Sequence, residues 1–212
     1  MYLERGDKKV FACSVDWPGW CRSGKDDDAA LAALAAYEPR YRSAISRARA
    51  RFPRDAVRDL SVVERVAGSG ATDFGVPHAV PDVDRRRISA ADAKRNATIL
   101  RAAWATLDRV VAASPPSLRK GPRGGGRDRD PMLDHVVEAE RSYARTIGVR
   151  HPPFDPADTT ARDAMRAEVL DVLSEPSDGS PLGGAKGWPA RYAVRRFTWH
   201  VLDHAWEMQD KS

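Results

Sequence analysis

Residues 195–210 contain neither glycine nor proline, so they predict one long helix near the end of the chain. His200 and His204 lie four positions apart in it, which places both imidazoles on one helix face. His200 also continues an apolar row through Phe197 and Val201, so the pair is expected to point inward. A protonated imidazole is costly there, whereas a neutral ring bound to a metal is not. A metal-binding pair is one interpretation, and a surface pair or two hydrogen-bonded core histidines is the other.

Three earlier segments have the same amphipathic character, with apolar residues recurring every three or four positions. Their ends are marked by capping residues, glycine or proline: Ser89 and Ser114 for the first helix, Asp130 and Gly148 for the second (132–147), Thr160 and Pro176 for the third, and Pro189 for the start of the last. The expected interior side chains are Trp104, Met132, Tyr143, Met165 and Phe197. Four such helices predict a four-helix bundle over residues 88–212.

The first part of the chain has a different pattern. Residues 9–15 and 20–23 read as the two strands of a hairpin around the turn Asp16-Trp17-Pro18-Gly19. A helix is expected over 29–37, a break at Pro39, a second helical piece over 40–51, and a strand over 60–66. The prediction is an α/β unit over 1–68 with the order hairpin, helix, strand. Residues 69–87 contain Gly75, Pro77 and Pro81 and are expected to be a linker, which makes the whole chain α+β.

Cys13 and Cys21 are the two cysteines of the chain, and they flank the hairpin turn. Cross-strand cysteines can form a disulfide where their geometry allows it. Two cysteines are too few for a disulfide framework, and a reducing compartment keeps them as thiols. The interpretation favoured here is two small buried hydrophobic residues.

The net charge of +5 comes from 35 basic and 30 acidic residues that are intermixed along the helices. Nucleic-acid-binding proteins usually cluster their positive charge on one face or arm. The densest basic cluster, residues 119–127, is rich in glycine and reads as a solvated loop, so a nucleic-acid partner is not expected. The sequence contains no long apolar run and no apolar signal-peptide core near Met1, which predicts a cytoplasmic protein without a membrane segment.

A catalytic metal needs a third ligand besides His200 and His204. The other histidines are His78, His135 and His151. His78 and His151 lie in proline-containing loops, whereas His135 lies beside the apolar row of the predicted second helix. If the three imidazoles form one site, their nitrogens must converge to about 3–3.5 Å of one another.

Three neutral imidazoles with open positions suit a divalent transition metal such as Zn, Ni or Fe. The reacting group is then unknown beyond a metal-bound water or thiol. Four carboxylates are close enough in sequence to hold the imidazole tautomers: Asp134, Glu138, Asp203 and Glu207. Other metal motifs fit less well, because Val201 replaces the glutamate of a metalloprotease helix and the carboxylates of a di-iron bundle are missing.

A lone histidine on the second helix, followed by H-x-x-x-H on the last helix of a four-helix bundle, is similar to the DinB superfamily. Segments 134–140 and 199–207 carry this resemblance, which extends over about 87–210. It implies that His135, His200 and His204 are the metal ligands. Characterised members include thiol-dependent transferases and isomerases, such as mycothiol-dependent maleylpyruvate isomerase. The resemblance therefore implies a metal, a low-molecular-weight thiol such as mycothiol, and a small electrophilic substrate.

The N-terminal unit resembles the HicB-like antitoxin fold in its strand, its D-x-P-G turn, its second strand with Gly24, and its Ala-Leu helix at 29–31. Proteins of that family bind a partner toxin, so this resemblance implies a protein partner for residues 1–68. Two functions follow as expectations. One is a metal- and thiol-dependent transferase or isomerase. The other is an antitoxin-like or regulatory binding module whose helical bundle is a metal-bound scaffold. A homodimer is left open.

Overall fold

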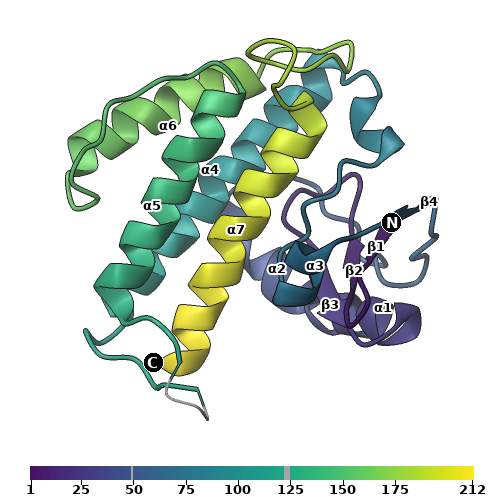
Figure 1. Ribbon diagram of the computed structural model, residues 1–212, viewed down its shortest axis with the longest axis horizontal. Coiled ribbons are helices and arrows are strands. Elements are labelled where there is room, and N and C mark those ends of the chain that lie inside the picture. Colours follow the sequence, from purple (N-terminus) through teal and green to yellow (C-terminus); the bar gives the residue numbers. More distant parts are fainter. Residues whose placement is uncertain (49, 122–124) are drawn as a thin grey trace.

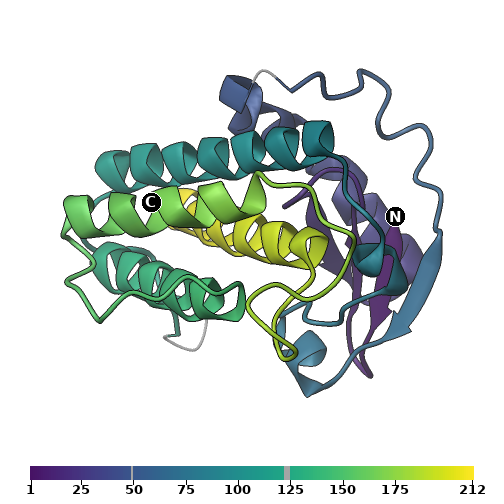
Figure 2. The same ribbon diagram turned by 90° about the horizontal axis from the view of Figure 1, so that it is seen from above.

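The structure is a computed structural model that describes residues 1–48, 50–121 and 125–212. Its class is α+β, as the sequence predicts, with a four-stranded sheet gathered at one side of a group of long helices (Figures 1 and 2). No helix in these residues is both long and apolar enough to cross a membrane.

The sheet has the strand order β3-β2-β1-β4. Strands β1 (Tyr2–Arg5), β2 (Val10–Cys13) and β3 (Cys21–Gly24) are antiparallel neighbours, and β4 (Glu64–Ala67) lies parallel to β1. The predicted hairpin is confirmed. The order hairpin, helix, strand is wrong because it omits β1, and β4 starts later than residue 60. Four residues that include a buried glutamate give too short an apolar pattern to predict β1.

Two short helices follow the hairpin. Asp26 caps α1 (Asp27–Ala36) by accepting a hydrogen bond from the Ala29 amide. Helix α2 (Glu38–Ala44) begins directly after Tyr37 with a proline in its first turn, so the predicted break at Pro39 is confirmed. The helical piece predicted over 40–51 is too long, since α2 ends at Ala44 and a 3₁₀ turn η1 (Ser46–Ala48) follows. Residue 49 in that range lies outside the described residues.

The four predicted long helices are α4 (Ala90–Ala113), α5 (Arg129–Thr146), α6 (Thr159–Leu173) and α7 (Ala190–Lys211). Between residues 89 and 209 the described chain forms only isolated bridges and no strand. Ser89 caps α4 as expected. Helix α5 begins earlier than expected, with Asp128 and not Asp130 at the capping position. Pro131 does not delay the start, because the first amides of a helix have no intrahelical acceptor.

Residues 69–87, expected to be a linker, contain the short helix α3 (Gly70–Phe74) and the 3₁₀ turn η2 (Asp82–Arg85). The fully buried carboxylate of Glu4 in β1 accepts hydrogen bonds from the Thr72 hydroxyl and from the amides of His78 and Ala79. A buried carboxylate is stable only when its oxygens are satisfied in this way. These hydrogen bonds therefore hold residues 69–87 against the sheet.

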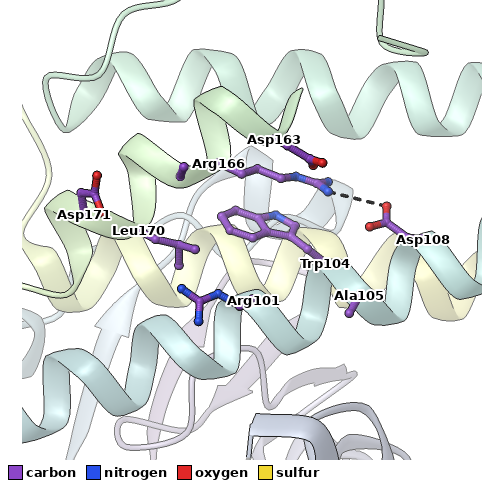
Figure 3. Close-up of a pocket in the computed structure, with 9 residues that line it drawn as sticks. Arg101, Trp104, Ala105, Asp108, Asp163, Arg166, Leu170 and Asp171 are labelled. Carbon is purple, nitrogen blue, oxygen red and sulfur yellow. Dashed lines mark ion pairs between the residues drawn. The ribbon is translucent and has the colours of Figure 1, made fainter. Parts of the chain in front are cut away.

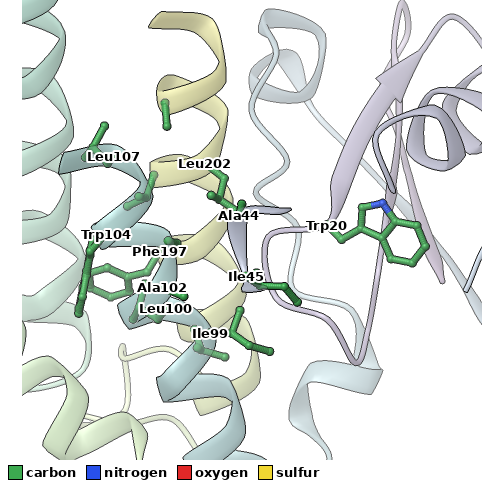
Figure 4. Packing of buried hydrophobic residues seen from close by; sticks show 14 of the residues in the cluster. Trp20, Ala44, Ile45, Ile99, Leu100, Ala102, Trp104, Leu107, Phe197 and Leu202 are labelled. Atoms are coloured by element: carbon green, nitrogen blue, oxygen red, sulfur yellow. The ribbon is translucent and has the colours of Figure 1, made fainter. Parts of the chain in front are cut away.

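The sheet unit and the helical bundle share one hydrophobic core (Figure 4). Trp20 of the hairpin and Ile45 after α2 are buried in the same cluster as Ile99 of α4 and Leu202 of α7. Of the expected interior side chains, Trp104, Met132, Met165 and Phe197 are buried, whereas Tyr143 is half-buried. The two predicted units are thus packed against each other through their apolar side chains.

The basic loop predicted over 119–127 can be followed only in part, because residues 122–124 lie outside the described residues. The described part of the loop makes a backbone hydrogen bond and an ion pair with neighbouring residues. The Arg119 amide donates to the Lys211 carbonyl at the end of α7, and Lys120 pairs with Asp128. The loop therefore lies beside the C-terminal end of α7.

Cys13 and Cys21 are directly opposed in the register of β2 and β3, with Cα atoms 4.1 Å apart, and they are joined as a disulfide. The interpretation as two separate thiols is therefore wrong. The physical reason is the register: Ser14 and Trp20 form the adjacent hydrogen-bonded pair, which leaves the two cysteines at the closer, non-hydrogen-bonded position.

A buried ion pair connects three parts of the chain. The guanidinium of Arg195 on α7 contacts the carboxylate of Asp84 in η2 and the hydroxyl of Tyr2 in β1, and all three side chains are almost fully buried. Removing one partner of such a pair leaves an uncompensated buried charge.

We therefore expect Asp84→Asn to lower the free energy of unfolding by about 3 kcal/mol, measured by urea denaturation. Asp82→Asn in the same turn is the matched control, because Asp82 is exposed, and it should change stability by less than about 0.5 kcal/mol. Equal effects of the two substitutions would contradict the role given to the Arg195–Asp84 pair.

Candidate metal centre

The three predicted ligands come together between two helices that lie side by side (Figure 1). His135 lies on α5, and His200 and His204 lie on successive turns of α7. His200 is only 5% exposed, whereas His135 and His204 are partly buried. The expectation that the α7 pair points inward is confirmed for His200 and holds in part for His204.

The rings converge closely. Nε2 of His135 lies 3.3 Å from Nε2 of His200, and one ring nitrogen from each of the three residues lies within 4.8 Å of the others. The ring centroids are 4.6–5.1 Å apart. The closest pair thus meets the 3–3.5 Å separation expected for shared ligands, and the full group is somewhat wider. Two neutral imidazoles with facing Nε2 atoms can share one proton or one cation between them.

A carboxylate holds one of the rings in place. Nδ1 of His204 lies 3.1 Å from Oε2 of Glu207, so this nitrogen donates to the carboxylate and Nε2 keeps its lone pair for a metal. The hydrogen bond from His204 lowers the pKa of Glu207 to about 2, assisted by Lys211. Of the four candidate carboxylates, Glu207 contacts a ligand. Asp203 pairs with Arg22, Glu138 pairs with Arg141, and Asp134 is exposed.

The surroundings of His135 and His200 favour their neutral forms. Burial lowers the pKa of His135 to about 4, with the charges of His204 and Arg127 adding to the effect. Burial also holds the pKa of His200 well below its usual value. A metal binds imidazole only in its neutral form, so His135 and His200 are suited to bind a cation near neutral pH. Nδ1 of His200 is buried without a hydrogen-bond partner among the described residues, which leaves Nε2 as the nitrogen directed at the group.

Two residues beside the triad were missed by the sequence analysis. Tyr143 on α5 lies with its ring 5.6 Å from that of His200, and its hydroxyl accepts a hydrogen bond of 2.9 Å from Arg196. Arg196 precedes His200 by four positions, so it lies one turn away on the same helix face. That spacing was a usable signal for Arg196. No local signal pointed to Tyr143, because its place depends on how α5 packs against α7.

The remaining histidines are elsewhere. Nε2 of His78 contacts the Ser69 hydroxyl at 2.6 Å, and Nε2 of His151 contacts Glu168 at 3.1 Å. Neither belongs to the three-histidine group. Their prediction as loop histidines outside the site is confirmed.

A hollow of about 370 Å³ between α4 and α6 is separate from this centre (Figure 3). The indole of Trp104 and the guanidinium of Arg166 form its wall, with Asp108 near the rim. Trp104 and Arg166 both donate to the buried carboxylate of Glu140. Because the polar groups deepest in this wall already satisfy one another, the hollow has no free ligand set like that of the three histidines.

Neither the protein-family models nor the curated proteins nor the solved structures give a match to this chain.

We expect His135→Ala, His200→Ala or His204→Ala to weaken Zn²⁺ binding by more than about a hundredfold, because each removes one of three donors. The measurement is competition with a chromophoric chelator on protein without a histidine tag. His78→Ala and His151→Ala are the matched controls and should bind as the unaltered protein does. Unchanged affinity in His135→Ala would remove the α5 ligand from the site.

Glu207→Gln should weaken the same binding by about tenfold to a hundredfold, since the His204 imidazole loses the partner that orients it. Glu138→Gln is the control, because Glu138 is exposed and pairs with Arg141 on the same helix rather than with an imidazole. If both variants bind equally well, the Glu207 contact does not support the site.

Proposed function

We propose that the protein is a metal-dependent enzyme that transfers a low-molecular-weight thiol to a small electrophilic substrate, or isomerises the substrate with that thiol. The observation that carries the proposal is the convergence of His135, His200 and His204 at ring-centroid distances of 4.6–5.1 Å. A purely structural core has no need for three imidazoles that face one another. A divalent transition metal held there supplies a Lewis acid that lowers the pKa of a thiol or water.

The chain's own residues have distinct parts in this proposal. His200 is the buried ligand, and its position is set by the packing of α7. His135 and His204 are partly exposed, so one side of the group is accessible to a thiol and a substrate. Glu207 keeps the proton of His204 on Nδ1. Three protein ligands with accessible positions are typical of catalytic metal sites, whereas structural sites are closed by four.

The resemblance to the DinB superfamily supports a low-molecular-weight thiol as a cofactor. The order of the four helices and the places of the histidines on the second and the last agree with that pattern. A Zn, Ni or Fe ion and a thiol such as mycothiol are the proposed cofactors. The N-terminal unit of 1–68 and the glycine-rich loop after α4 depart from the pattern, so the resemblance does not identify the acceptor substrate.

A second proposal assigns binding to the N-terminal unit, with the metal as part of a scaffold. It is supported by the large hydrophobic side chains that the described residues expose, which are Val57, Val63 and Phe74. All three lie between residues 50 and 75 and none lies on the bundle. If this chain is an antitoxin-like module, a partner protein such as a toxin would cover such side chains. The shared core between sheet and bundle argues against a unit that acts alone.

The deciding experiment measures metal and turnover on the same sample. Tag-free protein should contain close to one transition-metal ion per chain by elemental analysis. It should also convert a small electrophile such as maleylpyruvate when mycothiol is present, either by transfer, which consumes free thiol, or by isomerisation, which changes the electrophile and releases the thiol again. His200→Ala should have neither property. The His151→Ala control should keep both.

Two other outcomes of this experiment would contradict the enzyme, and one of them would favour the scaffold proposal. Protein that holds the metal but neither consumes thiol nor isomerises any of several electrophiles in its presence would contradict the enzyme and favour the scaffold. Protein without stoichiometric metal, even after reloading with Zn²⁺, Ni²⁺ or Fe²⁺, would contradict both.

A further inference from the structure

The loop before α7 passes close to the end of α5 (Figure 1), and a hollow of about 440 Å³ is lined by residues of both. Its wall contains three cationic side chains: Arg145 near the end of α5, Arg150 just after it, and Lys186 in the loop. The rest of the wall is glycine, alanine and threonine, with no carboxylate. The hollow is therefore strongly positive.

The three cations have no counter-charge in the part of the chain that the structure describes. None of them takes part in an ion pair or a side-chain hydrogen bond there. Arg141, one turn earlier on α5, pairs with Glu138 in the usual way. Like charges around one hollow repel one another, and a bound anion relieves that repulsion.

The loop backbone adds hydrogen-bond donors to the three cationic side chains. Gly183 and Gly184 have φ values of +69° and +109°, in the left-handed region that favours glycine. A Cβ on Gly183 would lie 2.5 Å from the Gly148 amide nitrogen, and one on Gly187 would lie 1.5 Å from the Leu182 carbonyl oxygen. Contact with the end of α5 thus holds the loop in one shape.

In this loop conformation, several backbone amides have no hydrogen-bond acceptor among the described residues. The amides of residues 183–186 donate to no acceptor in the described chain, whereas the Gly187 amide closes a turn on the Gly184 carbonyl at 2.8 Å. Unpaired backbone amides in a glycine-rich turn, together with arginine and lysine, are the groups that proteins use to bind phosphate.

A simpler explanation is that the cations stabilise the C-terminal end of α5, where the helix dipole is negative. This accounts for one charge near the last turn and for a modest gain in stability. It does not account for Lys186, which comes from a separate loop, or for the free amides beside it. The two explanations differ in what they predict for anion binding.

We propose that Arg145, Arg150 and Lys186, with the glycine-rich loop 183–187, bind the phosphate or diphosphate group of a small molecule. The site is separate from the three histidines and does not depend on the proposed function. The arginines supply planar pairs of donors for the oxyanion, Lys186 supplies a point charge, and the loop amides complete the hydrogen bonds.

The test is calorimetric titration of the full-length protein with inorganic phosphate, pyrophosphate and ADP in a buffer free of other oxyanions. At least one of the three should bind. The triple variant Arg145→Gln, Arg150→Gln and Lys186→Gln should bind it at least about a hundredfold more weakly, at about tenfold for each charged hydrogen bond lost. Tight binding of pyrophosphate and ADP, with weak binding of phosphate, would assign the site to a diphosphate group.

The matched control is Arg47→Gln, Arg54→Gln and Lys94→Gln, which removes the same number and kind of exposed charges elsewhere. It should bind as the unaltered protein does. Equal losses in the two triple variants would mean non-specific attraction and overturn the proposal. So would the absence of binding to any of the three anions, even if the site variant unfolds at a lower temperature, since only the helix-end explanation then remains.

Discussion

The fold depends on the burial of α7. This helix packs against α4 and α5 on the bundle side, and its Trp199 lies in a cluster with the sheet residues Phe11 and Cys13. A helix buried on several sides has little water for its polar side chains, so each of them needs a partner inside the protein. Arg195 forms an ion pair with Asp84, and the Thr198 hydroxyl donates to the backbone carbonyl one turn earlier. His200 lies on the same buried surface, where its nearest polar partner is another imidazole.

The N-terminal unit contributes to this arrangement by covering α7. Arg22 in β3 donates to Asp203 at 2.7 Å and lies over the rings of Tyr37 and Trp206, at 3.8 and 4.4 Å from their centroids. These contacts hold the segment of α7 directly beside His204. The unit therefore helps to position the candidate metal centre, whatever further partner it has. Its packing also removes Asp203 from the set of carboxylates that could hold an imidazole.

Electrostatics distinguishes the two candidate sites. Burial and neighbouring positive charge disfavour protonation of His135 and His200, so these two imidazoles are suited to a cation. At the end of α5, two arginine side chains and one lysine side chain line a hollow to which the described residues contribute no carboxylate. The same helix, α5, thus carries a donor for a cation near its beginning and a cationic residue near its end.

Much of this protein was determined by the sequence alone. The four helices followed from the three-to-four periodicity and from caps such as Ser89, because both are local properties of the chain. His200 and His204 share a face through helix geometry, so that pair needed no tertiary information. The hairpin followed from its turn residues. Glu207 could be named as a candidate because it lies three positions after His204.

Tertiary structure decided the rest. Whether His135 meets the α7 pair depends on how α5 and α7 pack, and the choice of Glu207 over Asp203 depends on Arg22, which is 181 positions away. Strand β1 was missed because its four residues include Glu4, and the partners that allow this carboxylate to be buried lie about seventy positions away in residues 72–79. The disulfide needed the register of β2 and β3. The positive hollow required a loop near residue 185 to fold back on the end of α5, an approach that only the assembled bundle creates.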